Sequence, residues 1–329
     1  MLQFLNNQQN KKEHPNENFA REVMELFTLG RGNYTENDVK EAARAFTGWG
    51  FNLQGEFVFR EFQHDTGSKT FLGKTGNFDG DDIIDILLEQ KQTANFITKK
   101  VYRFFVNDKP DSEKIAWLAD RFYKSGYDIK KLMEDIFTSD WFYDDKNIGT
   151  KIKSPIELIV GIRRLLPLTL QNDAAQLLFQ RALGQILFYP PNVAGWAGGT
   201  NWIDSSSLMI RLQLPRLIQD NSDFNITTKP DDDTQMGMKE TSIKTTLRRM
   251  DKKNQFNIKA TINWDNQLRL LASIKKEALL TAIKECLLNK NSININNDVV
   301  QKATDTTTRD TYIKTATIAI MSTPEYQLC

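Results

Sequence analysis

The sequence is poor in cysteine, in net charge and in long apolar runs. Two cysteines among 329 residues are too few for a disulfide framework or a cysteine-based zinc site. Lys and Arg number 43 against 42 Asp and Glu, so the net charge of +1 gives no field that would gather polyanions. No apolar run reaches the roughly 18–20 residues of a membrane-spanning helix. We therefore expect neither a nucleic-acid partner nor a transmembrane segment.

The templates of the common enzyme classes are also missing. No G-x-S-x-G, P-loop, G-x-G-x-x-G or H-E-x-x-H pattern occurs, so the serine-hydrolase, ATPase, dehydrogenase and zinc-protease classes have no support. With only two histidines, a metal site would have to be completed by carboxylates, which suits Mg²⁺ or Ca²⁺ better than Zn²⁺. The cofactor is therefore unknown, and a divalent cation bound by carboxylates stays open.

What is present is helical periodicity in a composition typical of globular proteins, 40% hydrophobic and 26% charged. Residues 16–29 place Phe19, Val23, Leu26 and Phe27 on one stripe before Gly30, a natural helix stop. Thr35 and Asp79 are start signals for further helices, and Ser154-Pro155-Ile156-Glu157 is a capping box.

One region has strand character. The aromatic runs of residues 51–62 flank Gln54-Gly55, which predicts a hairpin, and a long loop follows it. The fold class predicted is mainly α, a multi-helix globular bundle with one small β-hairpin near residues 51–62.

The domain organisation follows from a change in composition. Residues 221–240 are polar and predict a linker or a long surface loop. We expect residues 1–220 to form a helical body that contains the hairpin and a Trp/Gly loop. The helices predicted within residues 241–329 have apolar faces that need a partner, so we expect them to pack on the same core.

The first helix carries a charge array. Glu17, Arg21 and Glu25 follow one another at i,i+4 spacing, with Glu22 beside them. Such an array can face a pocket, where Arg21 would orient an anionic substrate or tune a catalytic glutamate. The same spacing also suits a helix surface braced by ion pairs.

The loop after the hairpin places His64 beside Asp65, with Gly67 and Lys69 close behind. A histidine next to an aspartate on such a loop can act as a general base or a metal ligand. The alternative is an exposed turn in which Asp65 caps the backbone.

A third segment, residues 189–204, combines prolines, glycines and two tryptophans. Trp196 and Trp202, near the polar Asn192, could wall a binding pocket. The alternative is a long connection that the two tryptophans pin to the core.

Read in order, these segments resemble a bacterial family known as domain of unknown function 1800. The resemblance covers nearly the whole chain, and is carried by PNENFAREVMELFTLGRGNYTENDVKEAARAFTGW at 15–49, HDTGSKTFLG at 64–73, SGYDIKKLMEDIFTSDWFY at 125–143, KIKSPIELIVG at 151–161 and YPPNVAGWAGGTNWIDSSSLMIRL at 189–212.

The resemblance implies little about activity, because the family has none assigned. Members are typically longer and carry a further helical region before the match to MLQFLNNQQN. We therefore expect this chain to correspond to the family's C-terminal portion, Met1 being an internal methionine. On that expectation the native protein is exported or periplasmic, whereas a true start at Met1 implies a cytoplasmic protein. The resemblance also implies a partner at the cell envelope or among secreted proteins, an inference by association.

Two functions compete. The first is a hydrolase of an envelope or extracellular substrate, with its three polar segments converging on one pocket. Its catalytic candidates are His64 as base, Asp65, Arg21, Glu22 and Glu25, and its ligand-binding candidates are Glu17, Lys69, Asn192, Trp196 and Trp202. The second is a non-enzymatic helical scaffold or assembly partner, in which the aromatic segments 51–62 and 189–202 are contact surfaces. An exposed apolar patch without a concave polar pocket would favour the second.

Overall fold

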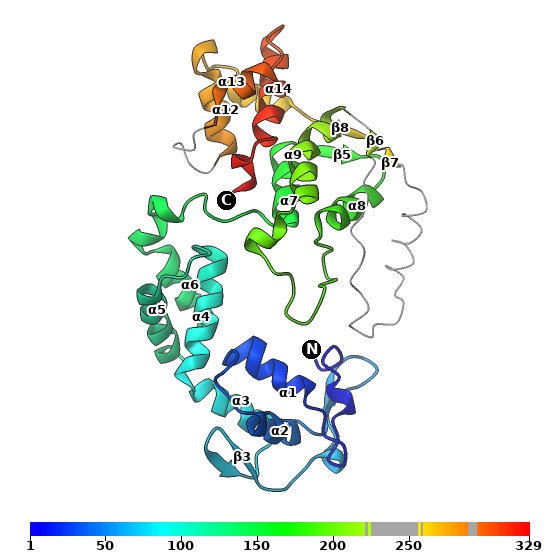
Figure 1. The fold of residues 1–329 in the computed structure, drawn as a ribbon, viewed down its shortest axis with the longest axis vertical. Helices are drawn as coiled ribbons and strands as arrows, with labels where there is room; N and C mark the ends of the chain where they lie inside the picture. The colour runs from blue at the N-terminus through cyan, green and yellow to red at the C-terminus, as the bar shows by residue number, and fades with distance from the viewer. Residues whose placement is uncertain (221–222, 225–255, 258, 289–294) are drawn as a thin grey trace. The chain divides into compact units, whose positions relative to one another are not determined.

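The computed structural model describes residues 1–220, 223–224, 256–257, 259–288 and 295–329. It divides into two compact units, Met1–Asp144 and Asp145–Cys329 (Figure 1). The predicted mainly α fold is confirmed, since the described strands form only small two-stranded sheets. Of the predicted linker 221–240, all but residues 223–224 lies outside the described residues, so that division of the chain stays a prediction.

The first unit contains six α-helices, one π-helix, three short 3-10 helices and two hairpins within its described residues. They are η1 (Asn7–Gln9), α1 (Asn18–Glu22), the π-helix η2 (Val23–Thr28), α2 (Glu36–Ala45), β1 (Trp49–Phe51), β2 (Phe57–Phe59), η3 (Glu61–Gln63), β3 (Lys69–Phe71), β4 (Lys74–Gly76), α3 (Gly80–Glu89), α4 (Lys91–Phe105), α5 (Ser112–Lys124), α6 (Ile129–Phe137) and η4 (Asp140–Tyr143).

The second unit is helical too, with short strands between its helices. Its described elements are η5 (Asp145–Asn147), α7 (Pro155–Leu165), β5 (Leu168–Leu170), α8 (Ala174–Leu183), η6 (Gly199–Trp202), α9 (Ser205–Asp220), β6 (Asp223–Phe224), β7 (Phe256–Asn257), β8 (Ala260–Ile262), α11 (Asp265–Leu271), η8 (Lys276–Ala278), α12 (Leu279–Leu287), α13 (Asn297–Lys302), α14 (Arg309–Met321) and η9 (Glu325–Gln327).

The predicted helix starts are confirmed by their caps. Thr35 and Asp38 form a reciprocal capping box at α2, as Asp79 and Asp82 do at α3. Ser154 opens α7 in the same way, with Pro155 in its first turn. Each box satisfies backbone N–H groups that the first turn of a helix leaves without partners.

The first long helix is not regular throughout. After Glu22 it widens into the π-helix η2, where the Leu29 amide donates to the Met24 carbonyl five residues earlier at 2.8 Å. The extra residue per turn rotates the side chains that follow. Phe27, predicted on the apolar stripe, is therefore exposed, and Leu29 is buried instead. Gly30 ends the segment with φ +79°, as predicted.

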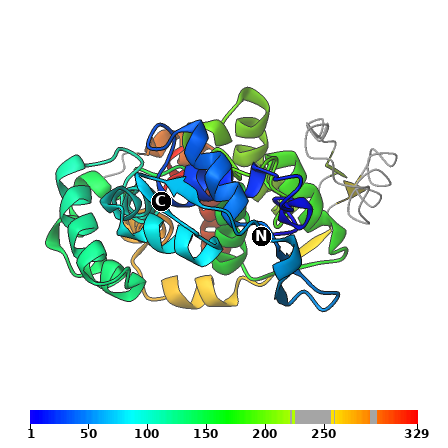
Figure 2. The same cartoon turned by 90° about the horizontal axis from the view of Figure 1, so that it is seen from below.

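The predicted hairpin is confirmed as β1 and β2, paired antiparallel with Gly50 opposite Val58. Its turn is built around Asn52, whose side-chain oxygen accepts from the Gln54 and Glu56 amides at 3.0 and 2.9 Å. Gly55 has φ +84°, a conformation that glycine adopts without strain. In Figure 2 the hairpin loops out beside the N-terminus.

The prediction of a long loop after this hairpin is wrong in part, because residues 69–76 form a second hairpin, β3–β4. Its two-residue turn has positive φ at Leu72 and Gly73, a backbone that the leucine gave no reason to expect. A tertiary contact holds it, since the Leu72 amide donates to Asp38 of α2 at 2.8 Å.

Each unit has its own apolar interior. In the first, the fully buried Phe46 of the α2 end packs edge-on against Phe19 and Trp49 at 4.9 and 5.2 Å between ring centroids. In the second, one core joins α7, α8 and α9 with α12 and α14, from Leu158 and Phe179 to Ile283 and Ile320. β5 pairs with β8, so residues on both sides of the 225–255 stretch meet in one sheet.

Gly80 gives a test of the first unit's packing. A Cβ placed there would lie 2.3 Å from Cζ2 of Trp49 and 2.8 Å from Phe46, closer than real Cβ contacts come. We expect Gly80→Ala to lower the free energy of unfolding by about 1–3 kcal/mol, the scale of overpacking. Urea denaturation followed by circular dichroism measures it.

The matched control is Gly161→Ala in α7, whose Cβ would make only an ordinary 3.8 Å contact with the Tyr326 hydroxyl. Because alanine is the better helix former, that substitution is expected to be neutral or stabilising, by up to about 1 kcal/mol. An equal loss in both variants would contradict the close approach at Gly80.

Candidate functional site

The predicted Glu/Arg helix is an ion-pair network anchored on α2. Arg21 donates to both carboxylate oxygens of Glu36, at 2.8 and 2.7 Å, and to Glu17 at 3.1 Å. These bonds raise the pKa of Arg21 above its usual value. Two of the predicted site residues, Glu17 and Arg21, thus contact each other, and Glu36, the second partner of Arg21, was not predicted.

Glu25 lies in the π-helix and has partners of its own. Its Oε1 accepts from Arg31 at 2.5 Å and its Oε2 from the Tyr34 hydroxyl at 2.9 Å. The bond from Arg31 lowers the pKa of Glu25. Burial, with the bond to Glu25, raises the pKa of Tyr34 to about 12, so its hydroxyl stays protonated at neutral pH.

Glu22 is the carboxylate of this group without an ion pair or hydrogen bond among the described residues. Partial burial raises its pKa, and the nearby charge of Glu25 raises it further, against a smaller opposing effect of Arg21. A carboxyl group of raised pKa holds its proton to a higher pH, which is the property of a general acid.

His64 is buried between the hairpin and the end of α2. Its Nδ1 lies 3.0 Å from the Thr47 carbonyl, which can only accept, so Nδ1 is the donor of this bond. The imidazole also packs edge-on against Phe59 at 5.3 Å between ring centroids. His64 is therefore not on the exposed turn that the sequence alternative expects, because its ring is buried.

Asp65 and Lys69 hold the loop around His64. Asp65 accepts from Arg44 of α2 at 2.8 and 3.2 Å, and the bond from that guanidinium lowers the pKa of Asp65. It also caps the Gly67 amide at 2.8 Å, as the structural alternative predicts. Lys69 is buried and donates to the carbonyls of Asp65 and Gly67 at 2.5 and 2.9 Å.

The charge array around Arg21 and the loop around His64 are bound to opposite ends of one helix, α2. Arg21 is bound to Glu36, the first residue of α2, and Asp65 is bound to Arg44, near its last. Eight residues of helix at 1.5 Å each separate these anchors by about 12 Å. The structure thus brings together His64, Asp65 and Lys69, and separately Glu17, Arg21, Glu22 and Glu25.

The Trp/Gly loop belongs to the second unit, so its place in a shared pocket stays a prediction. Asn192, exposed, forms a local turn in which its side chain accepts from the Ala194 amide at 2.9 Å. Trp196 and Trp202 are partly buried. The carbonyl of Trp202 accepts from Ser207 at 3.0 Å, which ties the end of the loop to the first turn of α9.

Sequence reasoning missed the most buried charge of the described residues. Arg211 of α9 is 0% exposed, and burial lowers its pKa to about 10. One Nη donates to the Lys153 carbonyl at 2.9 Å and the other to Gln327 at 3.4 Å, while Nε has no partner. An arginine placed directly between Ile210 and Leu212 was the available signal.

The chain around Arg211 is closed by residues 325–329. The Lys153 amide donates to the Gln327 carbonyl at 2.8 Å, and Lys151 and Cys329 exchange two backbone bonds at 3.1 and 2.8 Å. Lys153 also lies 3.8 Å from the centroid of the Tyr326 ring. This arrangement is a structural brace rather than an open site.

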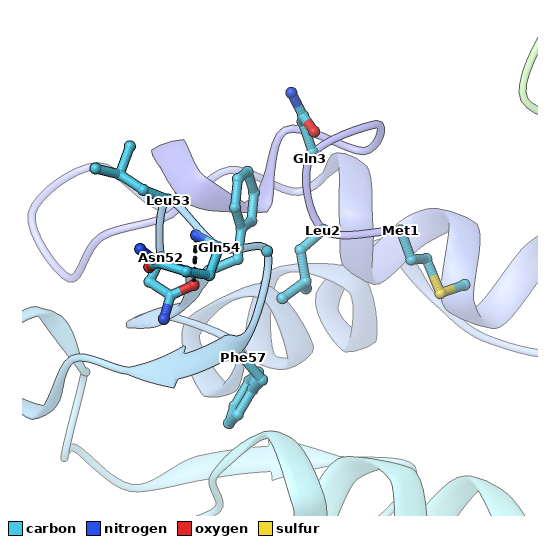
Figure 3. Close-up of a pocket in the computed structure, with 9 residues that line it drawn as sticks. Met1, Leu2, Gln3, Asn52, Leu53, Gln54 and Phe57 are labelled. Atoms are coloured by element: carbon cyan, nitrogen blue, oxygen red, sulfur yellow. Dashed lines mark hydrogen bonds between the residues drawn. The ribbon is translucent and has the colours of Figure 1, made fainter.

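The hairpin presents a surface of a different kind, which we call the hairpin surface: Met1, Phe4, Leu53, Phe57, Phe59 and Phe62. Leu53 is fully exposed, and Phe57, Phe59 and Phe62 are 58%, 44% and 72% exposed. An open pocket of about 560 Å³ lies between the hairpin turn and Met1–Gln3 (Figure 3). Leu2 and Phe57 are among its lining residues.

The described residues contain neither a metal-binding cluster nor a membrane-spanning helix. No group of three or more His, Cys, Asp and Glu side chains that could hold a metal ion is found there. Likewise, none of the helices in the described part of the chain has the length and apolar character to cross a membrane.

Comparison with known proteins gives the family. Residues 1–328 match a family described as protein of unknown function (DUF1800), and the chain belongs to it. Because the match extends over nearly all the residues, it does not support the expectation that only the C-terminal portion of the family is represented. Neither a curated protein nor a solved structure matches the chain.

Glu22 and Glu25 give a test of the site's electrostatics with opposite signs. The folded state raises the pKa of Glu22, so the stability that it contributes is present at low pH and lost as pH rises. The pKa of Glu25 is lowered, so its contribution is present at neutral pH and lost on acidification. At pH 7 we expect Glu22→Gln to raise the thermal midpoint and Glu25→Gln to lower it.

Near pH 4, close to the ordinary glutamate pKa, both differences from the parent protein should shrink. Thermal unfolding followed by circular dichroism at a series of pH values measures them. A midpoint that falls equally in both variants at pH 7 would contradict the environment described for Glu22.

Proposed function

We propose that the protein is a non-enzymatic assembly partner, which binds another protein chain through the hairpin surface. The observation that carries the proposal is the exposure of four large apolar side chains on the hairpin and the 3-10 helix after it, from Leu53 to Phe62. Contiguous apolar patches of this kind on soluble proteins typically mark interaction sites.

The polar residues predicted as catalytic or ligand-binding support this choice, because several of them are bound within the fold. Arg21 is bound to Glu17 and Glu36, and Asp65 is bound to Arg44, so their charges are used within the fold. Lys69 is taken up by two loop carbonyls. Groups engaged in this way brace the first unit and present little free capacity to a substrate.

The family resemblance bears on where the partner acts. We place it at the cell envelope or among secreted proteins, where the resemblance to the family suggests that such proteins act.

A second candidate is acid–base hydrolysis, favoured by one observation. Glu22 has a raised pKa and, within the described part of the first unit, no hydrogen-bond partner such as those that hold Glu17 and Glu25. In that function Glu22 would act as the acid, with Arg21 holding an anionic group nearby. Loss of ester hydrolysis in Glu22→Gln, but not in Glu36→Gln, would support it.

The assembly function is tested by photocrosslinking in the native host. We expect p-benzoylphenylalanine at Leu53 or at Phe62 to give one discrete adduct, because both side chains project from the hairpin surface. The probe at Ile129 of α6, exposed but outside that surface, is the matched control and should give none. The adducts are measured by immunoblot and identified by mass spectrometry.

A second variant links the adduct to the apolar surface. Phe62→Asp, combined with the probe at Leu53, places a charge on the hairpin surface and should abolish the adduct. Equal labelling at Leu53, Phe62 and Ile129, or none at any of them, would overturn the proposal.

A further inference from the structure

The second strand of the first hairpin has an open edge. The Arg60 amide donates to the Gly48 carbonyl at 2.8 Å, and the Asn52 amide donates to the Glu56 carbonyl at 3.0 Å. With Gly50 opposite Val58, the even-numbered residues of β2 are therefore the ones that bond to β1. In an antiparallel ladder the residues between them point their N–H and C=O groups the other way. Those residues are Phe57 and Phe59.

The two edges of the hairpin differ. The outer edge of β1 is covered by the N-terminal segment, since Asn7 donates to the Trp49 carbonyl at 3.0 Å and Gln8 to the Phe51 carbonyl at 3.4 Å. The backbone groups of Phe57 and Phe59 have no such partners in the described part of the chain. An unpaired strand edge is a template for pairing with another strand.

The sequence of this edge is complementary to itself. If two copies pair antiparallel about Val58, Phe57 of one lies opposite Phe59 of the other, and these residues carry the outward N–H and C=O groups. Glu56 of one copy then lies opposite Arg60 of the other, twice by symmetry. Opposite charges and aromatic residues placed directly across a ladder are stabilising pairs.

Both charges are available for that contact. The Glu56 carboxylate accepts a hydrogen bond from the side-chain amide of Asn52 at 2.8 Å, and it has no cation partner among the described residues. Arg60 donates to the Phe51 carbonyl at 3.1 Å and, in the same described part of the chain, has no carboxylate partner. Neither group must break an ion pair in order to meet the other.

We propose that the partner on the hairpin surface is a second copy of this chain, joined by antiparallel pairing of β2 with β2 to give a continuous four-stranded sheet. The inference rests on the proposed function, since it names the occupant of the same surface. Charge complementarity selects this occupant, because the register that pairs the outward backbone groups also pairs Glu56 with Arg60. Such an interface is isologous, as in most symmetric dimers.

The test is a charge exchange measured by sedimentation velocity on the full chain. The parent protein should be a dimer at about 100 µM, well above the Kd of a specific interface. Glu56→Lys places two cations opposite each other, and Arg60→Glu places two anions. Each variant alone should weaken dimerisation by about tenfold or more, the result of like charges facing each other across an interface.

An equimolar mixture of the two variants is the decisive sample. In the mixed dimer, the lysine introduced at 56 faces the glutamate introduced at 60, and the native Arg60 of the first chain faces the native Glu56 of the second. Both pairs are again opposite in charge, so we expect the mixture to dimerise. Rescue on mixing also shows that both variants fold, because an unfolded chain would not be rescued.

A backbone variant tests the strand edge itself. Phe59→Pro removes an outward N–H and leaves the bonds between β2 and β1 in place, and proline is tolerated on such edges. Phe59→Ala is the matched control, which loses the same ring but keeps the N–H. The proline variant should dimerise more weakly than the alanine variant.

The outcomes separate this inference from the proposed function. A parent protein that is monomeric at about 100 µM overturns the second copy as occupant, as does a dimer that neither charge variant weakens. If the Leu53 probe then gives an adduct with a different protein, the assembly function stands without the dimer. If it gives no adduct and the chain is monomeric, both fail.

Discussion

The first unit depends on the side chains of one face of α2. Arg44 binds Asp65 and Glu41 together, at 2.8 and 2.9 Å, and Glu41 in turn accepts from the Thr70 amide at 3.0 Å. Asp38, one turn earlier, accepts from the Leu72 amide. A ten-residue helix thereby fixes both the loop around His64 and the second hairpin. Because charged hydrogen bonds to a single helix add to the burial of Phe71 there, this part of the fold depends on polar geometry as well as on apolar packing.

Local signals sufficed wherever the stabilising contact is local. Caps such as Thr35 with Asp38, and the Gln54-Gly55 turn of the first hairpin, involve residues a few positions apart, so their sequences predicted them. The second hairpin was missed because its turn at Leu72 is held by Asp38, 34 residues earlier. The π-helix was missed for a related reason, since a helical period fits residues 16–29 well and only packing favours burial of Leu29 over Phe27.

In the candidate site too, the local contacts could be predicted from the sequence and the distant ones could not. The i,i+4 pair of Glu17 and Arg21 was predicted and is present, but the stronger partner of Arg21 is Glu36 on another helix. The sequence showed that His64 and Asp65 are adjacent, yet only the fold shows that His64 donates to the Thr47 carbonyl and that Arg44 neutralises the carboxylate. Arg211 illustrates the limit most clearly, because its partner Gln327 lies 116 residues away.

That last contact has a consequence for how the protein is made. The guanidinium of Arg211 is enclosed by residues 153 and 325–329, and it carries a charge that cannot be left dry without hydrogen bonds. During synthesis α7 and α9 emerge from the ribosome long before residues 325–329 do. Until then this arginine must remain in contact with water, so the second unit completes its interior only after those residues have left the exit tunnel. The burial of Arg211 therefore comes late in synthesis, whereas the first unit can fold while the second is still being made.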